Sequence, residues 1–497
     1  MERIVHTLRV RFQGIPICNA KGVAIYIPDC IQWATRVDQI GAGVLLASDS
    51  TARAWDAAHD RHAALDDKIR AVITWVEGSR ADAVELDALA DRGQRRGPLH
   101  GMLVGLKDNI ETAGIRTTCG ASFMSDNVPE HDATVVSMLR QSGAVVVAKL
   151  NMAELAWGAT TQNATYGSCR NPWDLDRIPG GSSGGSGAAL AAGYCQASLG
   201  TDTGASVRIP AALNGAVGLR PSVGSISTKG IYPVSVSQDT VGPMARSAVD
   251  AARLAEALIG FDPAEPYSIR SDGLPATALI GTALGGLRVG IAEQFFFDDL
   301  DPGVAEVVDE FLGWLGTQGT ARSSVGDFGQ AGAHEHWTRI VQCEGAMLHR
   351  ERLTSRPEDF SPDVFGRISA GLQVEATELA RSIDWRTRYR WRLDQVLNDL
   401  DVIVSPVVPV DVPLVGGYDS REQTAALGRI TYPWALHAGP TLSLPIGFHP
   451  QSANPVAIAL TAARFAEARL FQVAATYQHD TQWHERWPAV VESVSTG

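Results

Sequence analysis

The clearest helical pattern in the chain lies between Thr51 and Val76. Apolar and amphipathic side chains recur there every three or four positions, as along the buried face of a helix: Ala52, Trp55, Ala58, His62, Leu65 and Ile69. A second helix is predicted from Asp82 to Ala90. The arginine- and glycine-rich stretch 92–98 that follows it indicates a solvated loop.

Short apolar runs alternate with further helical patterns along the rest of the chain. The runs predict buried strands at 102–106, 145–149, 194–199, 287–291, 401–406, 441–446 and 455–460. The patterns between them predict helices at 132–141, 152–157, 188–192, 247–259, 304–315, 374–397 and 464–477. This alternation is typical of an α/β protein with helices on both faces of a mostly parallel sheet.

Composition and charge exclude some classes of function. The chain has 497 residues, of which 45% are hydrophobic and 20% charged, so it can bury a sizeable core. Its net charge of −13, without a basic cluster, argues against nucleic acid as a partner. His334, His336 and His349 lack metal-ligand spacing, and the six cysteines are dispersed. We therefore expect neither a metal nor a cofactor.

The same features bear on location. We find no signal peptide and no run of 18 apolar residues, so we expect no membrane association. The cysteine pattern is typical of reduced thiols, which favours the cytoplasm.

A glycine- and serine-rich stretch at 180–187 is the first candidate for chemistry. Its sequence, Gly-Gly-Ser-Ser-Gly-Gly-Ser-Gly, would suit a flexible linker, but the alanine-rich run 188–192 follows at once and favours a helix. Backbone N–H groups at the start of such a helix are able to bind an anion. A plain helix cap by Ser182 or Ser183 is the other interpretation that the loop alone allows.

Ser206 is the second candidate. The strand predicted at 194–199 leads into Gly-Thr-Asp-Thr-Gly-Ala-Ser-Val-Arg-Ile-Pro at 200–210. Small residues precede the serine and leave it uncovered, so it is placed to react. Four consecutive N–H groups are candidates for an oxyanion hole: those of Thr203, Gly204, Ala205 and Ser206.

These two segments, together with Leu-Lys-Asp-Asn at 106–109, resemble the motifs of the amidase signature family of serine amide hydrolases. The motifs follow the family's order and spacing, and the likeness extends from about residue 50 to the C-terminus. It implies a single α/β/α sandwich domain over residues 46–497, around a large mixed, mostly parallel sheet. Residues 1–45 match nothing in the family, and we treat them as an unassigned N-terminal extension.

The resemblance implies a catalytic triad of Lys107, Ser182 and Ser206, with a cis peptide bond before Ser182. Lys107 would accept a proton from Ser182, which would accept one from Ser206 as Ser206 attacks the amide carbonyl. A buried lysine suits this role because desolvation lowers its pKa, and only the neutral amine accepts a proton. Three residues would support the site, although ordinary loop hydrogen bonding explains each of them as well: Ser183, Asp202 and Arg208.

One position departs from the family pattern. The family commonly has glycine where this chain has Ala205. If residue 205 required a positive φ, alanine would cost about 1 kcal/mol or more. We expect alanine to be tolerated, because a small side chain suffices to clear the nucleophile.

A rival motif overlaps the glycine-rich loop. Residues 181–185 match G-x-S-x-G, which would make Ser183 the nucleophile of an α/β-hydrolase. That motif needs a strand directly before it, whereas 171–179 is a polar loop that contains proline. We therefore prefer Ser206 as the nucleophile.

The substrate pocket is the least determined part of the site. Several residues fall in regions expected to border it and favour an apolar or aromatic substrate group, although aromatic residues are also ordinary core residues: Phe123, Met124, Trp157, Trp337, Tyr432, Trp434 and His437.

We predict a serine amidase that hydrolyses a C–N bond of a small-molecule amide. The same residues allow a carbamate, hydrazide or ester as substrate, or the A subunit of a glutamine-dependent tRNA amidotransferase. The resemblance leaves a homodimer open, and a catalytically silent binding protein on the same scaffold is a further alternative.

Overall fold

The computed structural model describes residues 50–416 and 420–495. The extension predicted at 1–45 lies outside the described residues, so that part of the domain assignment stays a prediction.

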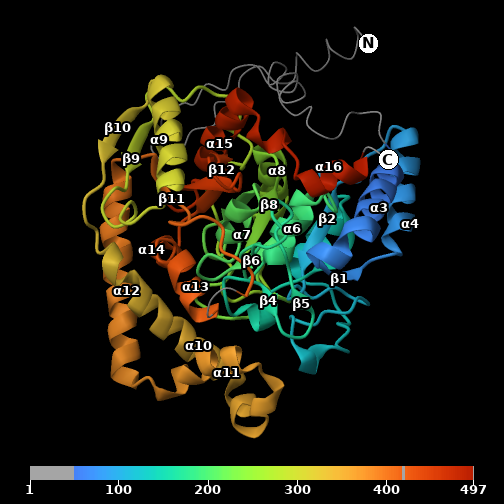
Figure 1. Cartoon of the computed structure of the whole chain (residues 1–497), viewed down its shortest axis with the longest axis horizontal. Helices are drawn as coiled ribbons and strands as arrows, with labels where there is room; N and C mark the ends of the chain where they lie inside the picture. Colours follow the sequence, from blue (N-terminus) through green and yellow to red (C-terminus); the bar gives the residue numbers. More distant parts are fainter. Residues whose placement is uncertain (1–49, 417–419, 496–497) are drawn as a thin grey trace. The chain divides into compact units, whose positions relative to one another are not determined.

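A mixed sheet of eleven strands runs through the described part of the chain (Figure 1). In order across the sheet the strands are β1 (Val72–Trp75), β3 (Val145–Leu150), β2 (Leu103–Lys107), β6 (Ala197–Asp202), β8 (Thr240–Ala245), β7 (Val217–Arg220), β12 (Thr441–Phe448), β13 (Pro455–Thr461), β11 (Val402–Pro406), β9 (Arg288–Ile291) and β10 (Ala321–Ser324). A separate two-stranded hairpin pairs β4 (Gln162–Asn163) with β5 (Gly167–Ser168).

The sheet is mixed, as expected, but it holds fewer parallel pairs than predicted. β2 lies parallel to β3 and β6, and β9 lies parallel to β10 and β11. The other six neighbouring pairs are antiparallel. Short connections such as the one between β12 and β13 reverse the chain direction and leave no room for the crossover helix that a parallel pair needs.

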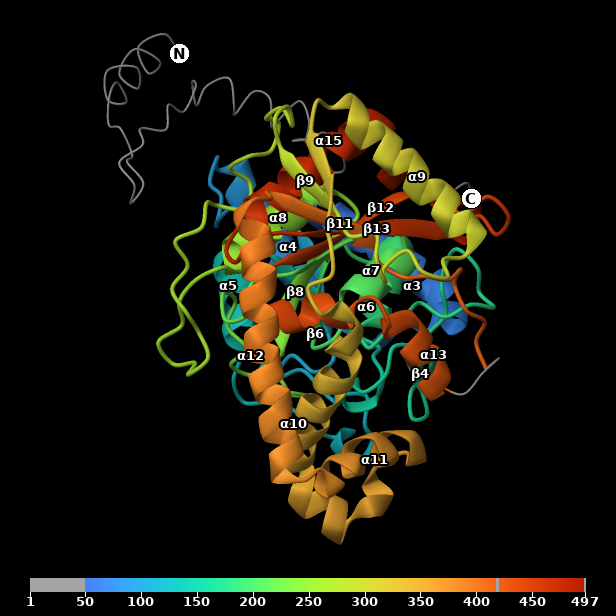
Figure 2. The ribbon, with the colours of Figure 1, turned by 90° about the vertical axis from the view of Figure 1, so that its left-hand side faces the viewer.

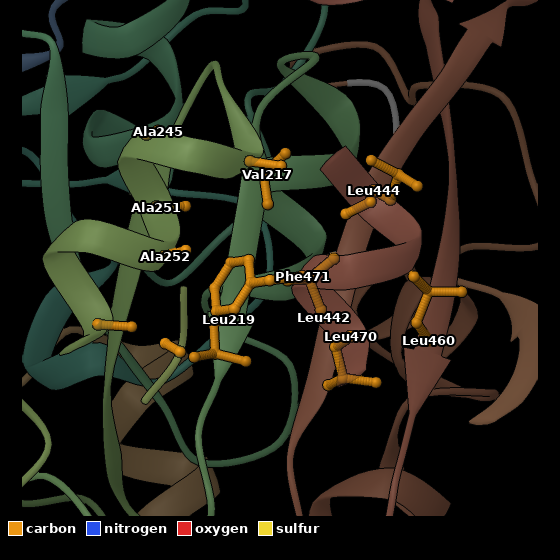
Figure 3. Close-up of a cluster of buried hydrophobic side chains, with 14 of the residues drawn as sticks. Val217, Leu219, Ala245, Ala251, Ala252, Leu442, Leu444, Leu460, Leu470 and Phe471 are labelled. Atoms are coloured by element: carbon orange, nitrogen blue, oxygen red, sulfur yellow. The ribbon is translucent and has the colours of Figure 1, made fainter. Parts of the chain in front are cut away.

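Helices cover both faces of the sheet, which confirms the α/β/α sandwich. One face carries α5 (Thr134–Gln141), α8 (Ala248–Leu258), α9 (Pro302–Thr317) and α15 (Glu467–Thr481). Figure 3 shows how Leu470 and Phe471 of α15 pack against apolar side chains of β7 and β12. The other face carries α3 (Thr51–Ile69), α4 (Ser79–Asp91), α6 (Gly184–Ala191) and α7 (Arg208–Leu213).

A group of later helices packs beside the end of the sheet that holds β9 and β11. Apolar residues of α10 (Ala333–Ser355), α12 (Ala376–Asn398) and α14 (Tyr432–His437) form one cluster with Ile403 of β11. Figure 2 shows the two long helices α10 and α12 side by side. Shorter helices complete the fold: α11 (Pro362–Ser369), α13 (Ser420–Gly428) and α16 (Ala489–Ser495).

Two predicted helices are shorter than expected. The helix predicted over 51–76 ends at Ile69, because Arg70 takes the left-handed conformation and its N–H bonds to the Asp66 carbonyl. The residues after it form β1, where β-branched and aromatic side chains suit a strand that pairs with β3. The helix predicted at 152–157 is a single 3₁₀ turn at Glu154–Ala156.

Candidate active site

Sheet geometry brings the candidate base to the glycine-rich loop. Side chains alternate along β2: Val104 and Leu106 join the cluster under α8, so Lys107 points to the opposite face, where α6 lies. β2 and β6 are parallel neighbours. Their carboxyl ends, Lys107 and Asp202, therefore lie at the same edge of the sheet.

Lys107 is fully buried and holds two hydroxyl partners. Its Nζ lies 2.7 Å from Ser182 Oγ and 2.7 Å from Thr201 Oγ1. Burial lowers the pKa of Lys107 from 10.5 to about 7, although the negative charges of Asp239 and Asp202 oppose the change. About half of the lysine is therefore neutral at pH 7, which is the form that accepts a proton.

The glycine-rich loop is packed rather than flexible. Ser182 and Ser183 are fully buried, and the peptide bond between Gly181 and Ser182 is cis. Ser183 Oγ donates to the Thr201 carbonyl at 3.2 Å and accepts from the Thr201 N–H at 3.3 Å. A Cβ added at Gly185 would lie 2.5 Å from backbone atoms of Asn151. Close approach of backbone segments therefore explains this loop's need for glycine.

Ser206 lies between β6 and α7 and is half-buried at a cavity wall. Its carbonyl accepts a hydrogen bond from the Ser183 N–H at 3.2 Å. This bond connects the turn that carries Ser206 to the glycine-rich loop. Within the described residues, however, Ser182 Oγ and Ser206 Oγ form no hydrogen bond with each other. The structure thus joins Lys107 to Ser182 directly and brings only the backbone of Ser206 to the same loop.

In the backbone of residues 203–206, the carbonyl groups accept hydrogen bonds, whereas the N–H groups have no acceptor among the described residues. Trp337 Nε1 donates to the Thr203 carbonyl at 3.2 Å, and Arg208 Nη2 donates to the Gly204 carbonyl at 2.6 Å. No N–H group of these four residues has an acceptor in the part of the chain that the structure describes. All four residues line the cavity. The loop is thus held by its carbonyl groups, while its donors stay available to an oxyanion.

The departure at Ala205 brings no backbone strain. Its φ is not positive, so alanine is compatible with the turn. Gly204 has a stricter requirement, because an added Cβ would lie 2.5 Å from Cζ2 of Trp337.

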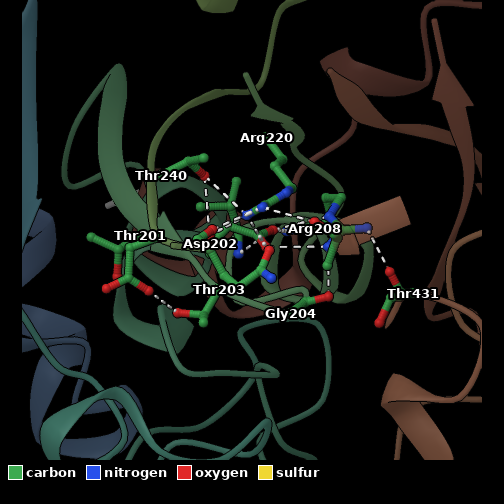
Figure 4. Close-up of polar contacts among 12 residues, drawn as sticks. Thr201, Asp202, Thr203, Gly204, Arg208, Arg220, Thr240 and Thr431 are labelled. Carbon is green, nitrogen blue, oxygen red and sulfur yellow. Dashed lines mark hydrogen bonds and ion pairs between the residues drawn. The ribbon is translucent and has the colours of Figure 1, made fainter. Parts of the chain in front are cut away.

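A buried ion cluster lies against the turn that carries Ser206 (Figure 4). Arg208 binds Asp202 through two contacts of 3.0 and 3.1 Å, and Arg220 Nη1 lies 3.2 Å from Asp202 Oδ1. Burial opposes ionisation of Asp202, but the two guanidinium groups outweigh it and hold its pKa below the usual value. Burial lowers the pKa of Arg220 to about 10. The cluster is also bonded to the backbone at the turn that carries Ser206, since Arg208 donates to the Gly204 carbonyl and Arg220 to the Asp202 carbonyl.

Sequence reasoning missed three residues of this site. Arg220 ends the apolar strand β7, and an arginine inside such a run is a usable signal for a buried ion pair. Thr201 Oγ1 contacts both Lys107 and Asn109. Asp239 accepts a hydrogen bond from Thr203 Oγ1 at 2.6 Å, and burial raises its pKa. No local pattern marks Asp239, since its role depends on the pairing of β6 with β8.

The cavity beside Ser206 has a volume of about 150 Å³. Trp157, Trp337 and Tyr432 line it, as predicted, and the rings of Trp337 and Tyr432 stack with centroids 4.3 Å apart. Arg367 and Arg421 also reach it, and both bind Asp363. No acidic side chain is among the described residues that line the cavity.

Four predicted pocket residues lie outside this lining. Trp434 is buried in the core, where its indole N–H donates to Ser405 Oγ and its ring stacks on Phe296. His437 is buried on the same short helix, with Nε2 3.4 Å from Asp394. Two more belong to a separate apolar cluster that includes Phe360: Phe123 and Met124. The positions of these four residues along the chain predict that they lie near the pocket. In the structure their side chains pack against other residues and do not line the cavity.

Neither a metal-ligand group nor a membrane-spanning helix is found among the described residues. No three His, Cys, Asp or Glu side chains gather there in a way that could hold a metal ion. None of the helices in residues 50–416 and 420–495 is long and apolar enough to cross a bilayer. The cysteines in this part are free thiols: Cys119, Cys169, Cys195 and Cys343.

Comparison with known proteins agrees with this geometry. Residues 53–471 match the Amidase family. The A subunit of a glutamyl-tRNA(Gln) amidotransferase from Heliobacterium modesticaldum is 34% identical over 455 residues, which cover 86% of this chain and 93% of that protein. Among solved structures, a chain of a vestigial complex linked to the origins of an s-triazine catabolic enzyme has a TM-score of 0.82 and 31% identity, covering 90% of this chain and 98% of that one. A peptide amidase bound to the inhibitor chymostatin has a TM-score of 0.79 and 30% identity, covering 91% and 97%. The chain belongs to the amidase signature family.

Proposed function

We propose that this chain hydrolyses the C–N bond of a small-molecule amide through an acyl-enzyme on Ser206. The observation that carries the proposal is the buried contact of 2.7 Å between Lys107 Nζ and Ser182 Oγ, with a lysine pKa of about 7. A base with a pKa near the working pH is half available at neutral pH and still strong enough to accept a proton.

In the first step, Ser206 Oγ attacks the amide carbonyl and loses its proton to Ser182, whose own proton passes to neutral Lys107. The N–H groups of residues 203–206 bind the oxyanion of the tetrahedral intermediate, and each such donor contributes about 3 kcal/mol in serine hydrolases. Return of the proton through Ser182 to the leaving nitrogen breaks the C–N bond. Water then attacks the acyl-enzyme ester on Ser206, with its proton passing through Ser182 to Lys107. The carboxylic acid product leaves, and Ser206 regains its proton.

The cavity supports a substrate with an apolar or aromatic group. The stacked rings of Trp337 and Tyr432 provide a flat apolar wall next to Ser206. Arg367 and Arg421, which share Asp363, disfavour a cationic substrate. Carbamates, hydrazides and esters stay alternatives within the same chemistry. The free thiols, three of them buried, support a cytoplasmic location. A homodimer is left open.

Covalent labelling tests the nucleophile. A fluorophosphonate probe, with intact-mass detection, is applied to the wild type and to the variants Ser206→Ala, Lys107→Ala and Ser183→Ala. We expect labelling to vanish in Ser206→Ala, to fall strongly in Lys107→Ala and to persist in Ser183→Ala. Labelling that persists in Ser206→Ala but is lost in Ser183→Ala would transfer the nucleophile to the rival motif. A panel of anilides, primary amides, carbamates, hydrazides and esters then defines the substrate.

A second candidate is the A subunit of a glutamine-dependent amidotransferase. Its support is the set of curated relatives, since subunits of that name from several bacteria are 32–34% identical over more than four fifths of this chain. This candidate predicts glutaminase activity and partner subunits that co-purify from the native host. Hydrolysis of simple amides by the isolated chain, without a partner, would favour the first candidate.

A further inference from the structure

A second cavity is lined by Asp239, the residue that accepts a hydrogen bond from Thr203 Oγ1. It has a volume of about 170 Å³, several times the ~30 Å³ that one water occupies in the liquid. Arg386 and Arg390 of α12 line it, together with Arg464 from the segment before α15. The loops around 223–228, 236–239 and 265–268 complete its wall. None of these residues lines the cavity beside Ser206.

The three arginines of this cavity lack carboxylate partners. Among the described residues, none of the three guanidinium groups lies within 4.0 Å of a carboxylate oxygen, whereas Arg208 and Arg220 nearby share Asp202. The hydrogen bonds that the three do make go to neutral acceptors: Arg386 to Ser237 Oγ at 2.8 Å, Arg390 to the Leu436 carbonyl at 2.6 Å, and Arg464 to the Val223 carbonyl at 3.0 Å. No carboxylate of the described residues therefore contacts these guanidinium groups directly, although Asp394, Glu344 and Glu467 attract them from farther away.

Arg390 is the most strongly affected of the three. Its Nη2 is buried and has no hydrogen-bond partner in the described chain, which is costly for a charged donor. Burial, together with repulsion from Arg386, Arg220 and Arg464, lowers the pKa of Arg390 to about 9. A negative charge in the cavity would relieve both the unpaired donor and the repulsion.

The acidic side chains that line the cavity already have partners. Asp239 accepts from Thr203 with one oxygen and from the N–H groups of Val234 and Ser235 with the other. Glu265 accepts from the Tyr267 N–H. Within the described residues, neither carboxylate forms an ion pair with the three arginines, and both already accept hydrogen bonds from other donors.

We propose that this cavity binds a small oxyanion, a carboxylate or a phosphate. Planar guanidinium groups donate in pairs to such anions, and three of them converge here from two separate segments of the chain. The site is separate from the amide-hydrolysing site, and its ligand is not the amide substrate.

Titration calorimetry tests the proposal on the full chain, with sodium phosphate in one series and sodium malonate in another, at constant ionic strength in chloride. We expect saturable binding of at least one of the two anions, one per chain, and the series that saturates identifies the anion class. The variants Arg390→Gln and Arg464→Gln should each weaken binding roughly tenfold or more, because each removes a charged donor pair.

Two control variants separate this site from others. Arg388→Gln removes a guanidinium on the same helix that is exposed and paired with Asp384, and it should bind the anion as the wild type does. Arg367→Gln alters the cavity beside Ser206 and should also leave this binding unchanged. Arg464 is exposed, so its variant should fold even if Arg390→Gln does not. No saturable binding of either anion, or binding that survives in Arg464→Gln, would overturn the proposal.

Discussion

Replacing Lys107 by methionine should stabilise the protein at neutral pH while it removes the proposed catalytic base. Burial moves the pKa of Lys107 from 10.5 to about 7. At pH 7 this corresponds to a penalty of about 4 kcal/mol on the folded state, since the unfolded chain holds the proton more tightly. Methionine has a similar unbranched shape and no charge to desolvate.

The expected gain is smaller than the penalty because two contacts are lost. Lys107 Nζ bonds to Ser182 and Thr201, and each hydrogen bond contributes about 1 kcal/mol. The free energy of unfolding of Lys107→Met should therefore exceed that of the wild type by about 2 kcal/mol at pH 7.

The sign of the pH dependence follows from the lowered pKa. Between about pH 7 and pH 10.5 the unfolded wild type binds one proton more than the folded wild type, so wild-type stability gains up to about 1.4 kcal/mol per pH unit from this group. The variant lacks that contribution. The advantage of Lys107→Met should thus shrink to about zero near pH 9 and reverse above it.

Urea denaturation at pH 7, 8 and 9 measures this difference. Lys149→Met is the matched contrast, because Lys149 is equally buried but lies 3.3 Å from Asp108, and its removal leaves a buried carboxylate unpaired. That variant should lose about 3–5 kcal/mol. If Lys107→Met is less stable than the wild type at pH 7, or if the difference between them does not change with pH, the argument for a neutral buried lysine is refuted.

Three further predictions concern catalysis and the catalytic loop. The rate of fluorophosphonate labelling should rise about tenfold per pH unit below pH 7 and level off above it, because only neutral Lys107 accepts the proton. Gly204→Ala places a Cβ 2.5 Å from Trp337 and should lower the labelling rate at least tenfold, whereas Ala205→Gly should stay near the wild type. Asp202→Asn removes the negative charge that Arg208 and Arg220 share and should cost about 3–5 kcal/mol, measured by urea denaturation.

Each of these has a contradicting outcome. A labelling rate that is flat from pH 5 to pH 9 would argue against lysine as the base. Equal labelling rates in Gly204→Ala and Ala205→Gly would mean that the loop or Trp337 shifts enough to accommodate the added Cβ. A loss below about 1 kcal/mol in Asp202→Asn would show that the two arginines do not depend on its charge.

The candidate catalytic residues could be singled out from the sequence because their signals are local. The glycine-rich loop before α6, the turn of small residues before Ser206 and the lysine at the end of β2 each stand out within a few positions. The helix α8 could be predicted at 247–259 for the same reason: Ser247, a residue type that favours helix caps, accepts hydrogen bonds from the N–H groups of Val249 and Asp250.

The wrong or missing predictions share a different cause. The apolar pattern of α3 continues into 72–75, and only pairing with β3 makes that segment a strand. The role of Arg220 depends on Asp202, which lies on another strand, and that of Asp239 on Thr203, which follows β6 and lies 36 residues earlier in the chain. Tryptophan and histidine are common both in substrate pockets and in protein interiors, so residue type alone does not place Trp434 and His437. Their packing in the tertiary structure buries both of them.

The sequence by itself determined the alternation of strands and helices, the three motifs and the kind of residue that is proposed for each chemical step. Periodicity, glycine placement and residue chemistry act over a few positions, so the linear chain contains them. Tertiary structure decided the strand directions, the pKa of Lys107 and the residues that line both cavities. It also decided which arginines form ion pairs with a carboxylate. These depend on burial and on charges brought together from distant segments, and no local pattern records which segments will meet.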